Sequence, residues 1–315
     1  MEEDKREPQV TADNKKNAVG RFFMDVVRGI AIGIAFIIPG FSGGSVAAIL
    51  GIYERLVGAI ADVFKHFKTS MQTLIPVVLG MLIGVAALIF PIQWGLSHAP
   101  VPTVSLFVGL ALGGLPSVTD KLKGERPNWK HALALLVPLL LAAGLCFLPL
   151  GKEVDLFSLN AGGYLLLILI GLVGSCALVI PGISGSMLLL IFGYYEPIVQ
   201  MITGSLLKGQ QIGTCILVLL MLVIGVAAGF FAVSVLMKYL LKRFPRGTYF
   251  AILGFIVGSI PVVYVSTVRK YSELSGLYVH PWYWIVSVAL LLFGIALSLL
   301  LVWLSKRKKK TETQE

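Results

Sequence analysis

The sequence predicts an all-α polytopic membrane protein built from two related halves. Its 315 residues are 57% hydrophobic and only 13% charged, with a mean hydropathy of +0.89, whereas soluble domains carry about 25% charged residues. Apolar segments of about 20 residues, the length that crosses a bilayer core, recur along the chain. A 16-residue motif also occurs twice, at 39–54 and at 181–196. These observations predict membrane-spanning helices and an internal duplication.

The repeated motif interrupts an apolar run in each half. The first copy reads Pro-Gly-Phe-Ser-Gly-Gly-Ser-Val-Ala-Ala-Ile-Leu-Gly-Ile-Tyr-Glu, and the second reads Pro-Gly-Ile-Ser-Gly-Ser-Met-Leu-Leu-Leu-Ile-Phe-Gly-Tyr-Tyr-Glu. Paired interruptions of this kind are the best sequence indication of a binding site in a secondary transporter, because free backbone polar groups are tolerated in a membrane only where protein or a wet cavity covers them. We expect broken or re-entrant helices at Pro39-Gly40 and Pro181-Gly182, whose loops enter from opposite faces and meet near the midplane.

The apolar segments divide equally between the halves. Leu82–Ala87 resembles Val223–Ala228, and the spacing of Gly109, Gly113 and Pro116 returns in Gly254, Gly258 and Pro261. We expect ten segments, near 22–38, 43–62, 72–92, 102–118, 131–150, 161–180, 185–203, 212–236, 247–268 and 281–304. The predicted regions are an N-terminal tail (1–20), a first transmembrane repeat (21–150), a second, inverted repeat (151–305) and a basic C-terminal tail (306–315).

The inversion is predicted from the number of crossings. The first two segments of each half are either two spans or one re-entrant hairpin, and both add an even number of crossings. Three further spans make each half odd, so the halves have opposite orientations. Most basic residues then fall on one side, which the positive-inside rule assigns to the cytoplasm together with both termini. The exceptions are Lys208, Arg269 and Lys270. The net charge of +10 is therefore attributed to topology and anionic lipid, not to nucleic acid.

The chemistry of the motif favours an anion. Proline ends one half-helix, and a serine can cap the next, whose first N–H groups are free to bind phosphate. The alternative is a simple packing kink, which the repetition of the whole motif disfavours. The expected substrate-binding residues are Arg28, Pro39, Gly40, Ser42, Gly43, Gly44, Ser45, Pro181, Gly182, Ser184, Gly185 and Ser186. The sequence suggests no catalytic residue, metal site or cofactor.

Several residues have two interpretations. Arg28 either contacts phosphate or pairs with Asp25, three residues earlier. Glu54 and Glu196 either end helices at the interface or carry a coupling proton. Three tyrosines are interpreted as interfacial anchors rather than ligand contacts: Tyr53, Tyr194 and Tyr195.

The double motif, the chain length and the duplicated halves resemble a bacterial membrane family of polyprenyl-phosphate transporters. The resemblance covers about residues 20–305, and the family's motif positions fall on Glu54 and Glu196 as well as on the Pro-Gly and Ser-Gly residues given above. It implies transport of undecaprenyl phosphate from the outer to the inner leaflet of the plasma membrane, for reuse in cell-wall polymer synthesis. Met187 and Pro197 stand in the second copy where Ser45 and Arg55 stand in the first, so the two loops need not have equal roles.

Two other functions compete with lipid transport. Gly40–Gly43 and Gly182–Gly185 match the G-x-S-G pattern of rhomboid-type proteases. A serine nucleophile needs a base within reach, however, and the histidines lie in loops or at segment edges, so we expect no enzyme. The stronger alternative is a secondary transporter of a soluble small anion or ion. The sequence leaves open the coupling ion, the oligomeric state and the length of the prenyl chain.

Overall fold

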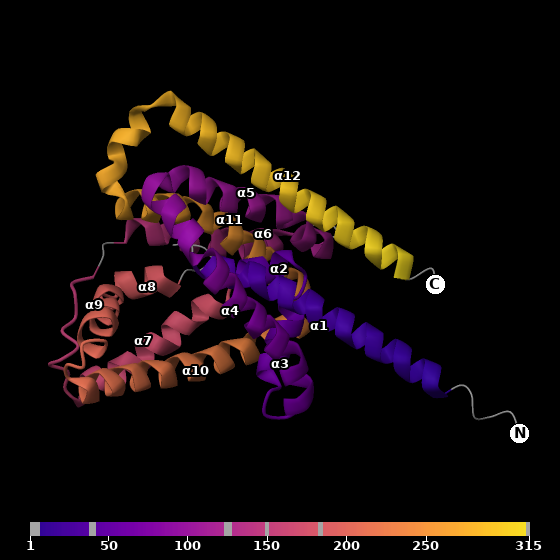
Figure 1. Cartoon of the computed structure of the whole chain (residues 1–315), viewed down its shortest axis with the longest axis horizontal. Helices are drawn as coiled ribbons and strands as arrows, with labels where there is room; N and C mark the ends of the chain where they lie inside the picture. Colours follow the sequence, from indigo (N-terminus) through magenta and orange to yellow (C-terminus); the bar gives the residue numbers. More distant parts are fainter. Residues whose placement is uncertain (1–6, 38–41, 123–127, 149–150, 182–184, 313–315) are drawn as a thin grey trace, which may run out of the picture.

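A computed structural model describes residues 7–37, 42–122, 128–148, 151–181 and 185–312, and this part of the chain is helical without strands. Figure 1 shows long helices stacked in a bundle, which confirms the predicted all-α class. The α-helices are α1 (Glu7–Ile37), α2 (Gly43–Ile49), α3 (Tyr53–Ala61), α4 (Phe67–His98), α5 (Pro100–Thr119), α6 (Trp129–Gly144), α7 (Ala161–Val179), α8 (Gly185–Ile191), α9 (Tyr195–Gln200), α10 (Ile212–Arg243), α11 (Pro245–Lys270) and α12 (Pro281–Glu312). Four short helical turns are η1 (Asp120–Leu122), η2 (Leu145–Phe147), η3 (Met201–Leu206) and η4 (Ser272–Val279).

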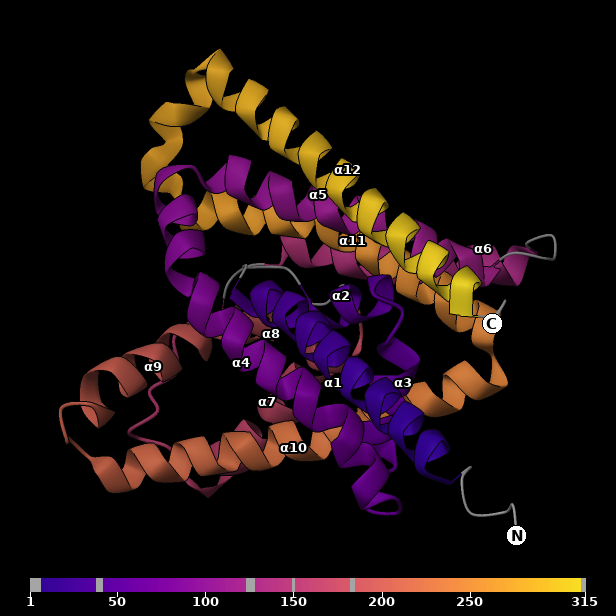
Figure 2. The same ribbon diagram turned by 45° about the vertical axis from the view of Figure 1, so that its right-hand side comes forward.

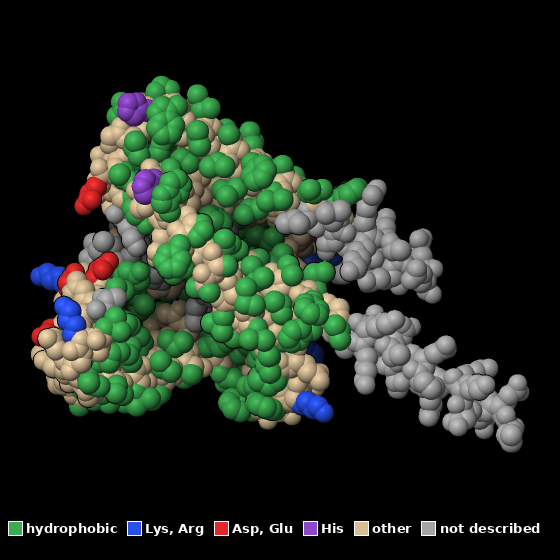
Figure 3. Space-filling model, in the orientation of Figure 1, with side chains coloured by type: hydrophobic (Ala, Val, Ile, Leu, Met, Phe, Trp, Pro, Cys, Tyr) green, Lys and Arg blue, Asp and Glu red, His purple; other side chains and the backbone are tan. Residues whose placement is uncertain are grey.

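Within the described residues, five helices are long and apolar enough to cross a membrane: α4, α5, α10, α11 and α12. The shorter apolar helices are α6 and α7. Figure 3 shows a largely hydrophobic surface over the middle of the molecule, with charged side chains near its left and lower right ends. Such a surface suits lipid in the middle and water at both ends. The chain is therefore a multi-pass membrane protein.

Two of the ten expected apolar segments each consist of two short helices. Segment 43–62 divides into α2 and α3, and segment 185–203 divides into α8 and α9. Both breaks follow a glycine with left-handed backbone, Gly51 (φ +69°) and Gly193 (φ +76°), a conformation that commonly ends a helix. The helices α2 and α8 have seven residues each. That is about 10 Å, too short to cross a core of about 30 Å, so the hairpin interpretation of the motif is favoured over two full spans.

Equivalent helix pairs in the two halves pack through glycines. In the first half α1 lies against α4, and a Cβ atom added to Gly29 would be 2.2 Å from the carbonyl oxygen of Val77. In the second half α7 lies against α10, and a Cβ atom on Gly171 would be 2.5 Å from the carbonyl oxygen of Leu222. A side chain at either glycine would push the two backbones apart. The duplication is therefore visible in the packing as well as in the sequence.

The same contacts correct the register of the sequence alignment. Gly80 approaches Val26 as Gly225 approaches Ile168, so Gly225 is the structural counterpart of Gly80. The resemblance of Leu82–Ala87 to Val223–Ala228 pairs Gly225 with Gly84 instead, about one helical turn away. Segments rich in Gly, Ala, Ile and Val match almost as well after a shift of one turn, and sequence identity alone therefore selected the wrong register.

The last helix of each half packs against the other half. The helix α5 lies against α12, and its counterpart α11 lies against α6. A Cβ atom on Gly109 in α5 would be 2.1 Å from the carbonyl oxygen of Leu291, and one on Gly254 in α11 would be 2.2 Å from that of Leu135. The spacing that Gly109 and Gly254 share thus corresponds to equivalent contacts. This exchange of helices ties the halves together.

Figures 1 and 2 show which segments lie at each end of the bundle. One end carries α3 together with the start of α1, the end of α10 and the end of α12; we call it the α3 end. The opposite end carries α9, η4 and the segment before α7; we call it the α9 end. The helices α1 and α7 begin at opposite ends, as an inverted duplication requires. The inversion itself, the cytoplasmic termini and the boundaries at residues 20, 150 and 305 stay predictions.

Candidate functional site

The first motif copy lies against the end of α7 and against Pro181, the first residue of the second copy. At the start of α2, the Ser42 hydroxyl donates a hydrogen bond to the carbonyl oxygen of Ala177 near the end of α7, at 3.3 Å. At the start of α3, the Tyr53 hydroxyl donates to the carbonyl oxygen of Val179 at 2.8 Å. Gly44 approaches the same region, and a Cβ atom on it would lie 3.1 Å from the Val179 oxygen and 3.4 Å from the nitrogen of Pro181. We call this contact region the motif junction.

The Ser42 side chain does not cap its own helix. Ser42 occupies the N-cap position of α2 with extended backbone, but its hydroxyl makes no hydrogen bond to the first turn of α2. It instead reaches across to Ala177. The predicted capping position is confirmed, whereas the predicted capping bond is wrong. Because the side chain is turned towards α7, the N–H groups that open a helix are not covered by their own cap at this position.

Ser45 is the most unusual polar residue of the motif junction. The residue is 2% exposed, and its hydroxyl has no hydrogen-bond partner among the described residues. A buried polar group without a partner costs about 1–3 kcal/mol, and native proteins contain few of them. Nothing among the described residues offsets this cost, which a bound polar ligand would remove. Gly43 and Gly44 are also buried beside it.

Part of the predicted substrate-binding set is only partly described. Pro181 is buried, and Gly185 begins α8 close to Gly174 and Ala177. Ser186 lies in α8, but its side chain is outside the described residues, as are Pro39, Gly40, Gly182 and Ser184. Their predicted roles stay predictions.

Arg28 pairs with Asp25, as one of its two interpretations expects. The distance between Arg28 Nη1 and Asp25 Oδ1 is 3.1 Å. The same carboxylate oxygen also accepts a hydrogen bond from Arg55 of α3. Asp25 is buried, with 5% of its side chain exposed, whereas the arginine side chains are 27% and 40% exposed. Two guanidinium groups therefore share one carboxylate at the α3 end.

The two motif glutamates lie on the surface. Glu54 accepts a hydrogen bond from Tyr249 and lies 3.5 Å from Lys121, with half of its side chain exposed. Glu196 is also exposed, in the first turn of α9. Their positions fit helix ends better than a closed proton site. The prediction of interfacial anchors is wrong for Tyr53 and Tyr194, because each is buried, with 3% exposed. The Tyr53 hydroxyl donates its hydrogen bond inside the protein.

A further ion pair fastens the far end of α3 to α10. The Lys238 ammonium donates a hydrogen bond to Asp62, which holds the pKa of that carboxyl below its ordinary value. The pair therefore persists at neutral pH, and its stabilisation is lost only as the pH falls through this lowered pKa.

We expect the change Lys238→Gln to lower the stability of the folded protein only slightly, since exposed pairs contribute up to about 1 kcal/mol. The charge-reversed double variant Asp62→Lys/Lys238→Asp should recover part of the loss. The measurement is the melting temperature of purified protein in detergent at pH 7. If the double variant melts at a lower temperature than Asp62→Lys and Lys238→Asp made separately, the two side chains do not interact directly.

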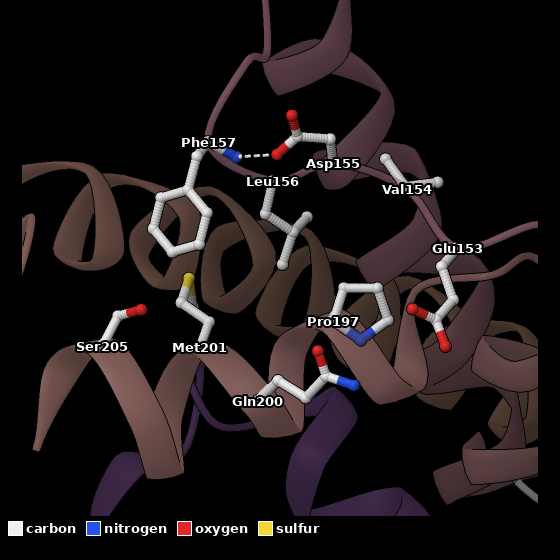
Figure 4. A pocket seen from close by; sticks show the side chains of 9 residues that line it. All are labelled: Glu153, Val154, Asp155, Leu156, Phe157, Pro197, Gln200, Met201 and Ser205. Carbon is white, nitrogen blue, oxygen red and sulfur yellow. Dashed lines mark hydrogen bonds between the residues drawn. The ribbon is translucent and has the colours of Figure 1, made fainter.

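A surface pocket lies away from the motif junction. It has a volume of about 460 Å³, and Figure 4 shows it between the segment before α7 and the helices α9 and η3. Its lining includes Glu153 and Asp155. The backbone N–H of Phe157 donates to Asp155 and holds the pKa of this carboxyl below its ordinary value. The pocket is therefore negatively charged at neutral pH, which makes it a poor site for phosphate.

Sequence reasoning missed most partners of the α3 end. Asp25 and Arg55 are 30 residues apart, and Glu54 and Tyr249 are 195 residues apart, so no local spacing indicates these contacts. One signal was present: Pro197 stands where the second motif copy would carry a counterpart of Arg55. A charged residue that is present in just one half indicates a role that the other half does not share.

Comparison with known proteins agrees with the geometry. A family model described as "VCA0040-like: Undecaprenyl phosphate translocase-like" matches residues 32–276. A polyprenyl-phosphate transporter of Staphylococcus aureus is 30% identical over 288 residues, which cover 89% of this chain and 95% of the relative. A polyprenyl-phosphate transporter of Vibrio cholerae is 26% identical over 255 residues, 76% of each chain. No solved structure matches. The chain belongs to the undecaprenyl phosphate translocase-like family.

Proposed function

We propose that this protein carries undecaprenyl phosphate from the outer to the inner leaflet of the bacterial plasma membrane, so that the lipid carrier is reused in cell-wall polymer synthesis. The observation that carries the proposal is the motif junction, where polar groups of both halves meet within an apolar bundle and Ser45 keeps a buried hydroxyl without a described partner. The two relatives named polyprenyl-phosphate transporters support the same substrate class.

Phosphate suits the motif junction on chemical grounds. A phosphate oxygen accepts hydrogen bonds from hydroxyl and backbone N–H groups, and such bonds are strong when the acceptor is charged. Gly43 and Gly44 place no side chain between the backbone and a head group. The helices involved are short, so we attribute binding to first-turn N–H groups and serine hydroxyls rather than to a long helix dipole. Ser184 and Ser186 would contribute from the second motif copy.

The proposed mechanism is alternating access. One half rocks against the other and exposes the phosphate to each leaflet in turn, while the prenyl chain stays in lipid through a lateral opening. Moving an anion inward works against a potential that is negative inside, at about 2.3 kcal/mol per charge per 100 mV. A proton that moves with the phosphate would remove this cost, and Glu54 and Glu196 are the candidate carriers. Normal transport by the variant Glu54→Gln/Glu196→Gln over a range of pH would exclude them.

Ser45→Ala gives a test in which stability and transport change in opposite directions. Removing a buried hydroxyl that has no partner among the described residues should leave the protein at least as stable. Loss of one hydrogen bond to a charged phosphate, which contributes about 1.5–3 kcal/mol, should slow transport by about tenfold or more. Ser234→Ala is the matched control, because its buried hydroxyl already donates to the Phe230 carbonyl within α10. The control should transport at the wild-type rate.

The measurement is undecaprenyl phosphate at the outer surface of cells that lack other recycling proteins, together with transport by purified protein in vesicles. Wild-type protein should clear the surface lipid, and Ser45→Ala should clear it slowly. Uptake of a soluble anion by vesicles without polyprenyl lipid, with no effect on surface lipid, would replace this proposal by the soluble-anion alternative. Equal transport by wild type and Ser45→Ala would remove Ser45 from the binding site.

A further inference from the structure

The α3 end contains a charge arrangement that the motif junction does not use. Arg28 of α1 and Arg55 of α3 both bind the same carboxylate oxygen of Asp25. The neighbouring ion pairs described at this end are one cation to one anion, Lys121 with Glu54 and Lys238 with Asp62. The Asp25 cluster therefore carries one positive charge that its own carboxylate does not neutralise.

The arginines are able to bind a second anion. A guanidinium group has five N–H donors in a planar fork that matches the oxygens of a carboxylate or a phosphate. Arg28 and Arg55 are partly exposed, whereas Asp25 is buried beneath them. An anion from the α3 end would thus meet two guanidinium groups before it meets the carboxylate. The buried Asp25 carboxylate also holds both arginine side chains in place when no other anion is bound to them.

The cluster is present in one half only. Through the duplication, Asp25 and Arg28 correspond to Leu167 and Ile170 of α7, and Arg55 corresponds to Pro197. Leu167 and Ile170 are buried in the apolar core of the second half. A purely structural tie between a motif helix and its neighbour would be equally useful in both halves. The restriction to the α3 end points to a task at that end.

We propose that Arg28 and Arg55 form a second binding site for a phosphomonoester at the α3 end, with Asp25 as a built-in competitor. This inference rests on the proposed function and adds a second phosphate-binding site to the transport path. Arg28 lies nine residues before the end of α1, about 14 Å along the helix axis from the break. The phosphate would therefore leave the motif junction, bind the arginine pair and then enter the leaflet at the α3 end.

The competitor explains how such a site avoids trapping its substrate. Two arginines without a counter-charge would hold a phosphate tightly and slow its release. Asp25 rebinds both guanidinium groups as the phosphate departs, so the cluster returns to a satisfied state. The cluster thus binds phosphate at the α3 end, but with an affinity low enough for the phosphate to be released. Because Leu167, Ile170 and Pro197 stand at the equivalent positions of the second half, the two ends of the path bind phosphate with different affinity.

The experiment measures binding to the purified full-length chain in detergent by calorimetry. The probe is geranyl phosphate, a short prenyl phosphate; geraniol lacks the phosphate and inorganic phosphate lacks the lipid. Arg28→Gln and Arg55→Gln should each weaken geranyl phosphate binding about tenfold, and Asp25→Asn should tighten it severalfold. Lys121→Gln, a cation of the same end paired with Glu54, should change it less than twofold. Arg55→Lys keeps the charge but loses the fork and should be intermediate.

Two further arms separate this site from the motif junction and from free phosphate. In a Ser45→Ala background, Arg55→Gln should still weaken binding by the same factor, because separate sites act independently. Inorganic phosphate that binds as tightly as geranyl phosphate would overturn the lipid assignment. Unchanged binding in both arginine variants and in Asp25→Asn, with folded protein, would overturn the site. The proposed function would then still stand if Ser45→Ala slows transport, and would fail if no variant does.

Discussion

The variant Gly80→Leu should fail to give a stable protein. A Cβ atom on Gly80 would lie 2.0 Å from the carbonyl oxygen of Val26 and 2.9 Å from the Cα atom of Gly29. These are backbone atoms, so α1 and α4 must separate along their whole contact. Overpacking costs about 1–3 kcal/mol in ordinary cores, and more where the backbone must move. We expect at least about 3 kcal/mol here, a large share of the total stability of a typical protein.

The duplication predicts an equal effect in the second half. A Cβ atom on Gly225 would lie 2.1 Å from the carbonyl oxygen of Ile168, so Gly225→Leu should destabilise the protein about as much as Gly80→Leu. Gly213→Leu is the matched control, since it lies on the same helix as Gly225 with nothing within 4 Å of the added atom. The measurement is the melting temperature and the fraction of monodisperse protein in detergent. A Gly80→Leu variant that melts with the wild type would show that α1 and α4 do not pack this closely.

The long helices could be predicted from the sequence, and the short ones could not. Hydropathy over about 20 residues locates α4, α5, α10, α11 and α12 because the bilayer sets their length. The division of segment 43–62 depends on one backbone angle at Gly51, which hydropathy does not record. A glycine within an apolar run has the same hydropathy whether it continues a helix or ends it. The hairpin interpretation is therefore favoured over two full spans only through the lengths of α2 and α8.

The candidate site could be located from the sequence but not resolved into its contacts. The repeated motif placed Ser42, Gly44 and Ser45 at the site because paired helix breaks are rare in membranes. It did not indicate that the Ser42 and Tyr53 hydroxyls would reach backbone carbonyls of α7, more than 120 residues away. Contacts to backbone oxygens leave no mark on the residue type that accepts them. Tyr53 was therefore interpreted from its position near a segment end, and that interpretation was wrong.

Ser45 and the Asp25 cluster give the first half a role that the second half does not share. At the equivalent positions the second half carries apolar residues or a proline: Met187, Leu167, Ile170 and Pro197. A duplication that kept identical chemistry in both halves would treat the two leaflets alike. Chemistry confined to one half lets the two ends of the path bind phosphate with different strength. Net movement still requires a driving force, but the ends need not have equal affinity for the lipid.

The change Gly44→Leu should abolish transport without unfolding the protein. Gly44 lies at the motif junction, where an added Cβ atom would be 3.1 Å from the Val179 carbonyl oxygen and 3.4 Å from both Cα and nitrogen of Pro181. A leucine must push α2 away from the end of α7, and the hydrogen bonds of Ser42 and Tyr53 to that segment would then break. We expect transport to fall at least about a hundredfold, the effect of losing several bonds to a charged ligand together.

The fold should survive because the extensive helix contacts lie elsewhere, between α1 and α4, α7 and α10, α5 and α12, and α6 and α11. Gly44→Ala should retain part of the activity, since a shift of a few tenths of an ångström accommodates one methyl group. Gly58→Leu is the control: it lies on α3, and nothing lies within 4 Å of its added Cβ atom. Transport in vesicles and the melting temperature are measured on the same preparations. If Gly44→Leu transports at the wild-type rate with an unchanged melting temperature, the lipid head group does not pass through the motif junction.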